Sequence, residues 1–446
     1  MHARNPLKVL GLGLALVVVF AIVSFAEDGE PKTLNVNMSS PGFSPSMSYQ
    51  NFGNGESVNT ASGGLTVVHN SSLSLPQNMG ASLNFTRVYN SKDSKDVLNG
   101  GTYVADEVFP NWGFLGPGWK MGFGRVFLRA VKNDSLNKYV AFIYYEDESG
   151  AEHRLYRIDS DGGNFAKLLN DNWDYSDIIK NDFPDDSKWY RSRDGSFIFA
   201  KFTNPLPTDL SRSYWTIFYP DGSKIICGGA NTGGEYNSFV MPLKSAYSSL
   251  CRNVGSNGWY ATRIIDKVGN TPIQIDYRGY DQSTQPYAGS ISKVTDQFGR
   301  ETSFEVWADG PANTADTFYM KGLLKDIIYP DGNIDHYEYT PSAILYYGLI
   351  NSVMLHKLQD PEGLQTLYKY QQKGSFLEKA YLNKIYYPTG AVSEYLYMHV
   401  DDVVINNGGT VCVRPKGDVI QEKILHLEDN NKLHWKWIRP DNAVGP

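Results

Sequence analysis

A fourteen-residue phrase is written twice in the last third of the chain, as DIIYPDGNIDHYEY at 326–339 and as KIYYPTGAVSEYLY at 384–397. The Pro-Asp-Gly or Pro-Thr-Gly at its centre is typical of a type I turn followed by a bulge, in which the glycine has positive φ. The flanks are rich in Ile, Tyr and Val, which favour strands. Each phrase therefore predicts a β-hairpin.

The hairpin recurs along the chain with a period near thirty residues. Glycines at 269, 299, 332, 363 and 390 stand at the centres of similar segments. Large apolar or aspartate residues recur five and three positions before these glycines, and apolar residues recur after them at a spacing of two, which places them on one face. A single hairpin is marginal in water, but stacked copies bury each other's faces. Earlier, degenerate copies are centred on Gly195 and Gly222.

These segments resemble a known repeat. D-x-x-G or Y-P-D-G followed by a strand ending Y-x-Y is similar to the tyrosine–aspartate (YD) repeat of rearrangement-hotspot (RHS) proteins, over residues 259–397. Upstream, 58–93 and 114–124 resemble the leader that precedes such repeats. The matching positions are Thr60, Gly64, Leu65, Leu75, Pro76, Arg87, Tyr89, Asn90, Ser91, Gly116, Gly118 and Trp119.

The resemblance implies a sheet that coils into a shell able to enclose cargo. We therefore expect an all-β protein in which stacked hairpins form an open spiral or partial shell, preceded by a β-rich leader subdomain. The family's closing segment and toxin-like cargo domain are not recognisable before Pro446. We accordingly expect a short member of the family, or one whose partner is encoded elsewhere.

The N-terminus has the pattern of an export signal. Arg4 and Lys8 precede an uncharged apolar run at 9–26, which ends in Ser24-Phe25-Ala26 before Glu27. Residues 1–26 are therefore predicted to be a cleaved signal peptide, and the protein to be secreted or held in the cell envelope. An uncleaved membrane anchor is the alternative, because about 18 apolar residues can just span a bilayer.

The remainder of the chain divides by composition. The predicted parts are a flexible lead-in (27–57), the leader region (58–135), an irregular β region with degenerate repeats (136–258), the YD repeats (259–397) and a β-strand tail (398–446).

Charge and cysteine content restrict the partners. The formal net charge is −7, and loss of Arg4 and Lys8 with the signal changes it to −9. Such a chain has no overall electrostatic attraction for nucleic acid or for an anionic membrane. In an oxidising compartment, Cys227 and Cys251 are the expected disulfide pair and Cys412 the odd cysteine. Three buried thiols are the alternative.

The sequence predicts no catalytic, cofactor or metal residues. H-E-x-x-H and G-x-S-x-G are both absent. The recurring turn aspartates are expected to bond the backbone two residues on, rather than to act as paired catalytic carboxylates. Exposed aromatic residues can stack on sugar rings. The glycan-stacking candidates are Tyr386, Trp435 and Trp437.

Three functions follow from these observations. The first is an exported RHS/YD-repeat scaffold that acts as an encapsulation, adhesion or interaction shell at the cell surface or outside, with a protein cargo or a downstream chain as partner. The second is a carbohydrate-binding protein of the envelope. The third is a secreted hydrolase with its site in 136–258, which requires convergent carboxylates or a Ser/His pair in one pocket.

Overall fold

The computed structural model describes these residues: 49–59, 64–77, 82–91, 114–116, 118–133, 138–158, 167–169, 188–204, 212–229, 239–240, 258–269, 272–278, 289–308, 322–346, 350–373, 379–400, 403–407, 410–414, 417–427 and 431–436. Over these ranges the protein is all-β, as predicted. The signal segment 1–26 lies outside them. Within them, no helix is long and apolar enough to cross a membrane.

The leader forms a small antiparallel sheet of its own, and its first strands begin within the range 27–57 predicted as lead-in, so the leader is taken from here on to begin at Tyr49. Its strands, in spatial order, are β1 (Tyr49–Asn51), β2 (Glu56–Asn59), β3 (Leu65–His69), β6 (Arg87–Asn90) and β7 (Trp119–Met121). Between β3 and β6 the chain adds a short pair, β4 (Leu75–Pro76) and β5 (Ser82–Leu83).

The middle of the chain closes a barrel. Its strands are β8 (Arg125–Asn133), β9 (Lys138–Glu146), β10 (Glu152–Arg157), β12 (Trp189–Arg191), β13 (Phe199–Thr203), β14 (Tyr214–Phe218), β15 (Lys224–Gly228) and β17 (Gly258–Ile265). The ring is closed by β17, whose first residues pair with β8 and whose later residues pair with β15. Two short strands join its edges: β11 (Lys167–Leu169) on β9 and β16 (Phe239–Val240) on β17.

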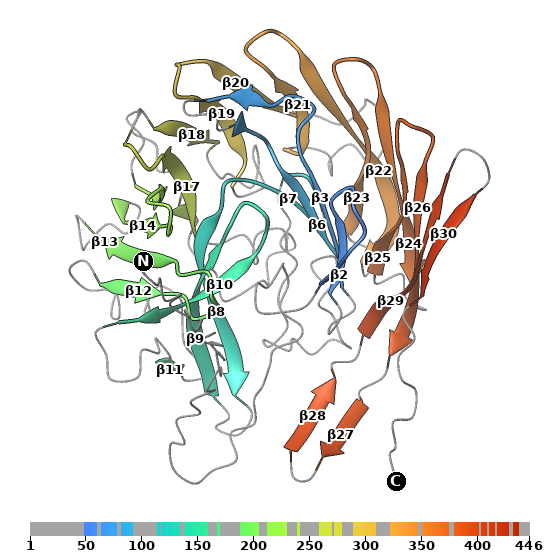
Figure 1. The fold of residues 1–446 in the computed structure, drawn as a ribbon, viewed down its shortest axis with the longest axis horizontal. Coiled ribbons are helices and arrows are strands. Elements are labelled where there is room, and N and C mark those ends of the chain that lie inside the picture. Colours follow the sequence, from blue (N-terminus) through green and yellow to red (C-terminus); the bar gives the residue numbers. More distant parts are fainter. Residues whose placement is uncertain are drawn as a thin grey trace, which may run out of the picture.

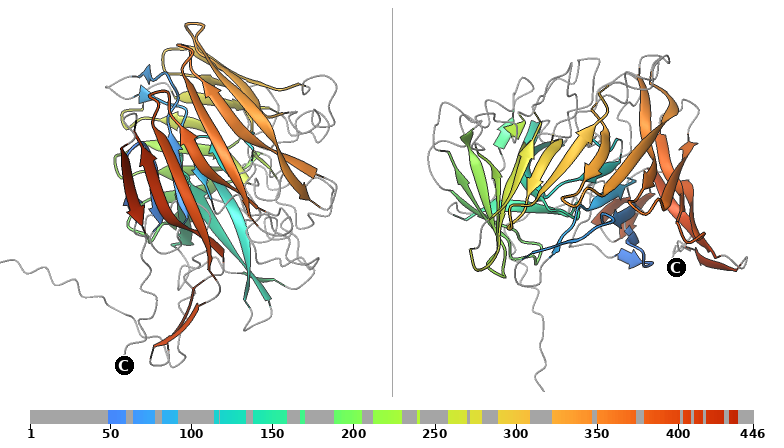
Figure 2. Two further views of the ribbon diagram at one scale, coloured as in Figure 1. Left: turned by 90° about the vertical axis from the view of Figure 1, so that its right-hand side faces the viewer. Right: turned by 90° about the horizontal axis from the view of Figure 1, so that it is seen from above.

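From β17 the sheet continues as the hairpin array. Its further strands are β18 (Ile273–Tyr277), β19 (Ile291–Thr295), β20 (Glu301–Val306), β21 (Leu324–Ile328), β22 (Ile334–Tyr346), β23 (Ile350–Gln359), β24 (Gln365–Lys373), β25 (Lys379–Tyr386), β26 (Val392–Val400), β29 (Gly417–His426) and β30 (Lys432–Lys436). A separate hairpin, β27 (Val403–Asn407) with β28 (Thr410–Arg414), interrupts the last turn of the array. Figure 1 shows the array curving from β17 to β30, with the leader strands β2, β3 and β6 on its inner side; Figure 2 shows the same arc from two further directions.

The turns have the predicted geometry. The five repeat glycines have φ between 76° and 86°, and Gly195 and Gly222 have φ of 87° and 92°. In the repeats the glycine N–H donates to the carbonyl three residues earlier, for example Gly363 to Asp360 at 3.0 Å. That residue's own N–H donates to the carbonyl just after the glycine. This pattern is the type I turn with a bulge.

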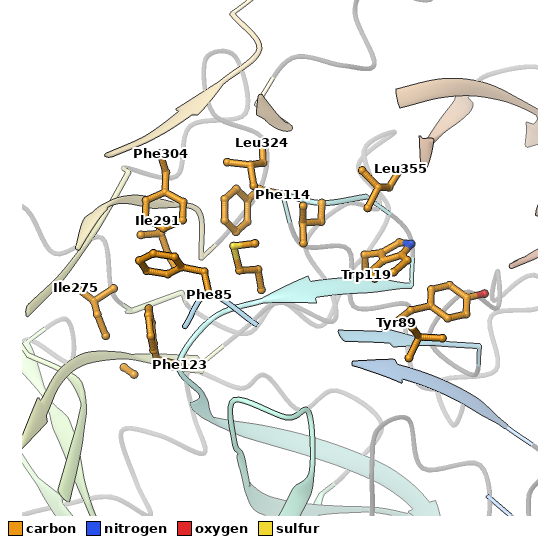
Figure 3. Close-up of a cluster of buried hydrophobic side chains, with 14 of the residues drawn as sticks. Phe85, Tyr89, Phe114, Trp119, Phe123, Ile275, Ile291, Phe304, Leu324 and Leu355 are labelled. Atoms are coloured by element: carbon orange, nitrogen blue, oxygen red, sulfur yellow. The ribbon is translucent and has the colours of Figure 1, made fainter. Parts of the chain in front are cut away.

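The face that the repeat was predicted to bury is buried. The apolar residues eight positions before the repeat glycines, Ile291, Leu324, Leu355 and Leu382, are all fully enclosed. Tyr339 and Tyr397 are buried and Tyr370 is half-buried, all within strands. Figure 3 shows where this face packs: Ile275, Ile291, Phe304, Leu324 and Leu355 of the array meet aromatic side chains of the leader region, among them Phe85, Phe114 and Trp119.

Candidate functional site: the leader–array interface

In the four repeats from Gly299 to Gly390, the position five residues after the glycine contacts a different residue of the leader. Phe304 packs edge-on against Phe85, with ring centroids 5.1 Å apart. Tyr337, Tyr368 and Tyr395 occupy the same position in the next three repeats, and their hydroxyls bond leader side chains. The partners are Arg87 Nη1 at 2.9 Å, His69 Nδ1 at 3.2 Å and the carboxylate of Glu56. The first tyrosine of Y-x-Y therefore fixes the array to its leader.

The second tyrosine of Y-x-Y closes its own repeat. The hydroxyls of Tyr370 and Tyr397 donate to the carbonyls of Leu355 and Leu382, fifteen residues earlier, at 2.7 and 2.8 Å. Tyr277 makes the corresponding bond to Ala261 at 2.6 Å. In the repeat of Gly332 the acceptor is a carbonyl of the leader. Both the Tyr339 hydroxyl and the Leu324 N–H donate to Phe114 O, at 3.5 and 2.7 Å.

Two of these tyrosines differ in one respect that a mutation can measure. Tyr370 Oη also accepts the indole N–H of Trp119 at 2.8 Å, and that ring is completely buried. Tyr397→Phe removes one hydrogen bond and should cost about 1 kcal/mol of unfolding free energy. Tyr370→Phe also leaves a buried N–H unpaired and should cost about 2–3 kcal/mol. Urea unfolding of the two variants measures the difference, and equal losses would contradict the role assigned to Trp119.

Glu56 is the most highly connected leader residue at this interface. Its side chain is fully buried, and its carboxylate accepts hydrogen bonds from Tyr387, Tyr395 and Ser393. Lys423 Nζ of β29 lies 2.6 Å from Oε2, and Lys423 is also buried. A carboxylate in β2 thus joins the last repeat to the strand that follows it.

A second polar group joins β3 and β6 to the repeat of Gly332. Arg87 donates to Tyr337 and to the Asn70 carbonyl, and its Nη1 is 3.9 Å from Asp335 Oδ2. Asp335 is fully buried and accepts from Tyr329 Oη at 2.9 Å. His69 lies opposite Arg87 in the ladder. Burial, and then the charge of Arg87, lower the pKa of His69 to about 4, so this imidazole is neutral at pH 7.

A small cavity lies where the leader meets the barrel and the first repeat. Its volume is about 60 Å³, and Lys120, Arg125, Glu146 and Tyr260 are among the residues that line it. Glu146 pairs with Lys120 Nζ at 2.6 Å and with Arg125 Nε at 2.8 Å. Burial alone would raise the pKa of Glu146, but these two cations lower it to about 2. The cavity therefore holds a carboxylate between two cations, and Glu146 stays ionised and cannot serve as a general acid.

The nearby His153 is bound on both sides by carboxylates. Its Nδ1 lies 2.8 Å from Asp194 and its Nε2 lies 3.3 Å from Asp147. Burial would lower the pKa of His153, but the hydrogen bonds and charges of these aspartates raise it to about 9. Neither ring nitrogen is left to activate a serine or cysteine, so this cluster joins β10 to the β12–β13 turn instead.

None of the described histidines has a hydrogen bond to a nucleophile that it could activate. His69, His153, His336, His356, His426 and His434 bond tyrosine hydroxyls, carboxylates or a backbone carbonyl, and none of these bonds goes to a serine or a thiol. Among the described residues no group of three His, Cys, Asp or Glu side chains could hold a metal ion.

The turn aspartates bond the backbone as expected. Asp296 Oδ1 accepts the N–H groups of Phe298 and Arg300 at 2.8 and 2.9 Å. Asp360 makes the same pair of bonds, and Asp331 accepts from the residue two positions on. The prediction of a structural role for these carboxylates is therefore confirmed.

The residues singled out from the sequence lie apart from one another. Tyr386 is half-buried on the outer face of the array, with Lys369 Nζ 5.0 Å from its ring centroid. Trp435 packs edge-on against Phe52 at 5.3 Å and lies near Lys423, so it belongs to the leader–array contact. Trp437 lies outside the described residues. Glycan stacking at Tyr386, Trp435 and Trp437 stays a prediction.

The cysteine prediction is only partly covered by the structure. Cys227 is fully buried in the barrel and its thiol is free, with burial raising its pKa. Cys251 lies outside the described residues, and of Cys412 only its place in β28 is described. Because Cys251 is not described, the pairing of Cys227 with Cys251 stays a prediction.

Sequence reasoning missed Glu56, Lys423 and His153. The one signal is a lone charged or imidazole residue at a strand position whose alternate neighbours are apolar, as for His153 between Ala151 and Leu155. That pattern is equally typical of an exposed strand face. Only the partner that such a residue meets in the folded chain distinguishes a buried position from an exposed one.

Comparison with known proteins gives distant similarities. No family model matches the chain. A curated relative, the probable dipeptidyl-peptidase 5 of Emericella nidulans, is 28% identical over 159 residues, which is 33% of this chain and 21% of the relative.

Three solved structures are similar at low TM-score. A TcdB2-TccC3-Cdc42 complex has a TM-score of 0.36 at 13% identity, over 78% of this chain and 19% of that one. A Photorhabdus luminescens Tc holotoxin pore has 0.36 at 12%, over 85% and 20%. The N-terminal domain of SpvB from Salmonella typhimurium has 0.28 at 12%, over 78% and 99%. The chain thus spans about a fifth of the length of the curated relative and of the first two structures.

Proposed function

We propose that this protein is an exported RHS/YD-repeat scaffold without a catalytic site of its own, which acts at the cell surface or outside as an interaction surface for a protein partner. One observation carries the proposal. Every repeat from Gly299 to Gly390 uses its fifth residue after the glycine to bind a separate leader group. The recurring aromatic residue of the repeat thus serves to join the array to its leader.

The same contacts decide among the roles that such a scaffold could have. The inner face of the array, over the described residues, is covered by the leader, and the tyrosines that a cargo would touch are buried there. Encapsulation by this part of the array is therefore disfavoured. Adhesion or interaction through the outer faces is favoured.

A test for catalysis addresses the hydrolase alternative directly. The purified chain should hydrolyse no dipeptidyl-p-nitroanilide substrate above the buffer rate, and a fluorophosphonate probe should label no serine, because the described histidines activate none. The control is the same preparation spiked with an active serine peptidase. Probe labelling that is lost on heat denaturation would contradict the non-catalytic part of the proposal.

A separate test addresses export. Fractionation of the producing cells, followed by mass spectrometry of the N-terminal peptide, should find the protein in the envelope or medium beginning at Glu27. A cytoplasmic protein that still begins at Met1 would contradict export. A variant with Ala26→Pro, which blocks cleavage at the expected bond, should shift the mass by the signal segment or abolish release.

A further inference from the structure

Two rows of side chains cross the outer face of the barrel in direct register. The first row is Tyr156, Arg191, Phe199, Phe218, Lys224 and Ile265, in which each residue is the ladder partner of the next. The second is Trp189, Lys201, Thr216, Ile226 and Arg263. Their strand neighbours Tyr190, Ala200, Trp215 and Ile217 point into the core, so both rows face outward.

These rows contain cations and rings but no carboxylate. We name them the aromatic–basic face. Among the described residues, Arg191, Lys201, Lys224 and Arg263 make no ion pair, whereas several lysines on the outer face of the array do, as Lys293 with Glu301 at 2.8 Å. Instead Lys201 and Lys224 lie over the rings of Trp189 and Phe218, at 5.7 and 5.4 Å. Three turn carboxylates border the face, and each has a hydrogen-bond partner: Asp194 binds His153, Asp221 binds Ser223 and Asp266 binds Gln297.

Several of the apolar side chains here are unusually exposed. Trp189 is 41% exposed and Phe199 is 42% exposed. In the β12–β13 turn beside them, Phe197 is 71% exposed and has a φ of 55°, a left-handed conformation that is costly for a residue with a large side chain. Neither burial nor a hydrogen bond explains a phenylalanine at this position.

We propose that the aromatic–basic face docks the protein on an anionic lipid surface, with lipid phosphates at the cations and the exposed rings at the headgroup boundary. Lys and Arg beside an anionic leaflet are attracted to it, and Trp and Phe favour the interface between headgroups and acyl chains. A soluble polyanion would use the cations but would give no reason for exposing Phe197, Phe199 and Trp189. Figure 1 places β12 to β14 at the side of the molecule opposite β30, away from the array.

The net charge of −7 predicted no such partner. That prediction averaged over the whole surface, whereas attraction to a membrane depends on the charges of the face that approaches it, within a Debye length of about 10 Å at 0.1 M salt. The inference does not rest on the proposed function, since a scaffold with no affinity for lipid would leave that proposal intact.

Vesicle partitioning tests the proposal. The full chain is mixed with vesicles of phosphatidylcholine alone or with a quarter phosphatidylglycerol, and the bound fraction is measured by flotation. Anionic vesicles should bind at least about tenfold more, and raising NaCl from 50 to 500 mM should remove most of this excess. Binding to neutral vesicles measures any contribution of the N-terminal apolar run, which all variants share.

Three variants assign the binding to this face. Lys201→Glu with Lys224→Glu should lower the partition coefficient at least about tenfold, whereas the matched change on the array, Lys293→Glu with Lys384→Glu, should change it less than twofold. Phe197→Asn should weaken binding at least about threefold while leaving the melting temperature unchanged or higher, because Asn tolerates positive φ. Circular dichroism verifies that each variant is folded.

Three results would overturn the proposal. The first is equal partitioning of the Lys201/Lys224 variant and the wild type. The second is binding that does not depend on phosphatidylglycerol. The third is binding to a soluble polyanion, dextran sulfate, in the absence of any binding to vesicles, since this would assign the face to a dissolved polymer.

Discussion

Glu56→Gln should remove about 3–5 kcal/mol of unfolding free energy. This is the largest loss expected from replacing one charged residue of the leader by an uncharged one. The native carboxylate accepts from Tyr387, Tyr395 and Ser393 and is paired with Lys423 Nζ at 2.6 Å. The glutamine keeps the shape but removes the charge and turns one acceptor into a donor. Lys423, which is 1% exposed, is then left as a buried ammonium without a counter-charge.

Equilibrium urea unfolding measures this loss, and two further variants define its origin. Glu301→Gln removes the partner of Lys293 from an exposed pair and should cost less than about 0.5 kcal/mol. Glu56→Gln combined with Lys423→Met removes both charges and should recover part of the loss, because the penalty lies in the uncompensated charge. A Glu56→Gln loss below about 1 kcal/mol would show that the carboxylate is not the joint between β2 and the last repeat.

The hairpins could be predicted because their signals are local. A glycine with positive φ, a turn residue before it and a period of two on each arm all lie within about fifteen residues, and together they fix turn, register and buried face. Tyr339, Tyr370 and Tyr397, each seven residues after its repeat glycine, lie on this face, as the spacing of two predicts.

The site could not be predicted, because its contacts join distant segments. Tyr337 and Arg87 are 250 residues apart, and Tyr395 and Glu56 are 339 apart. No periodicity encodes which leader residue meets which repeat. Trp435 illustrates the consequence: an aromatic residue in an exposed-looking tail was a candidate for sugar stacking, whereas its ring packs against Phe52 of the leader. Barrel closure by β17 on β8 is equally remote in sequence.

The order of these contacts says something about assembly. Glu56, the earliest of the four leader residues, contacts the last repeat, whereas Phe85 contacts the repeat of Gly299 and Arg87 the next one. Because the leader precedes the repeats in the chain, it is synthesised first. Its contacts are completed only when the last repeat is present. Contacts of such long sequence separation form slowly. The leader is best understood as a core around which the array closes.

The stability of the fold should be greatest near pH 6.5 and fall on both sides, because two buried histidines have pKa values displaced in opposite directions. In the folded state the pKa of His153 is raised to about 9, chiefly by hydrogen bonds to Asp147 and Asp194 after burial has opposed them. In the unfolded chain it titrates near 6.5. The folded protein thus binds the extra proton between these values, so this stabilisation is complete below pH 6.5 and is lost as the pH rises to 9.

His69 acts in the opposite sense. Burial and the charge of Arg87 lower its folded pKa to about 4, so the unfolded chain binds the extra proton between pH 6.5 and 4, and stability falls as the pH decreases through that range. A displacement of this size corresponds to about 3 kcal/mol for each histidine. Urea unfolding at pH 4.5, 6.5 and 9 measures both slopes. His153→Gln should abolish the alkaline slope alone and His69→Gln the acid slope alone, irrespective of their effect on stability at pH 6.5. The leader–array interface contributes His69 and the barrel contributes His153, so the two slopes report on different parts of the fold. An alkaline slope that survives His153→Gln would show that another group binds the extra proton.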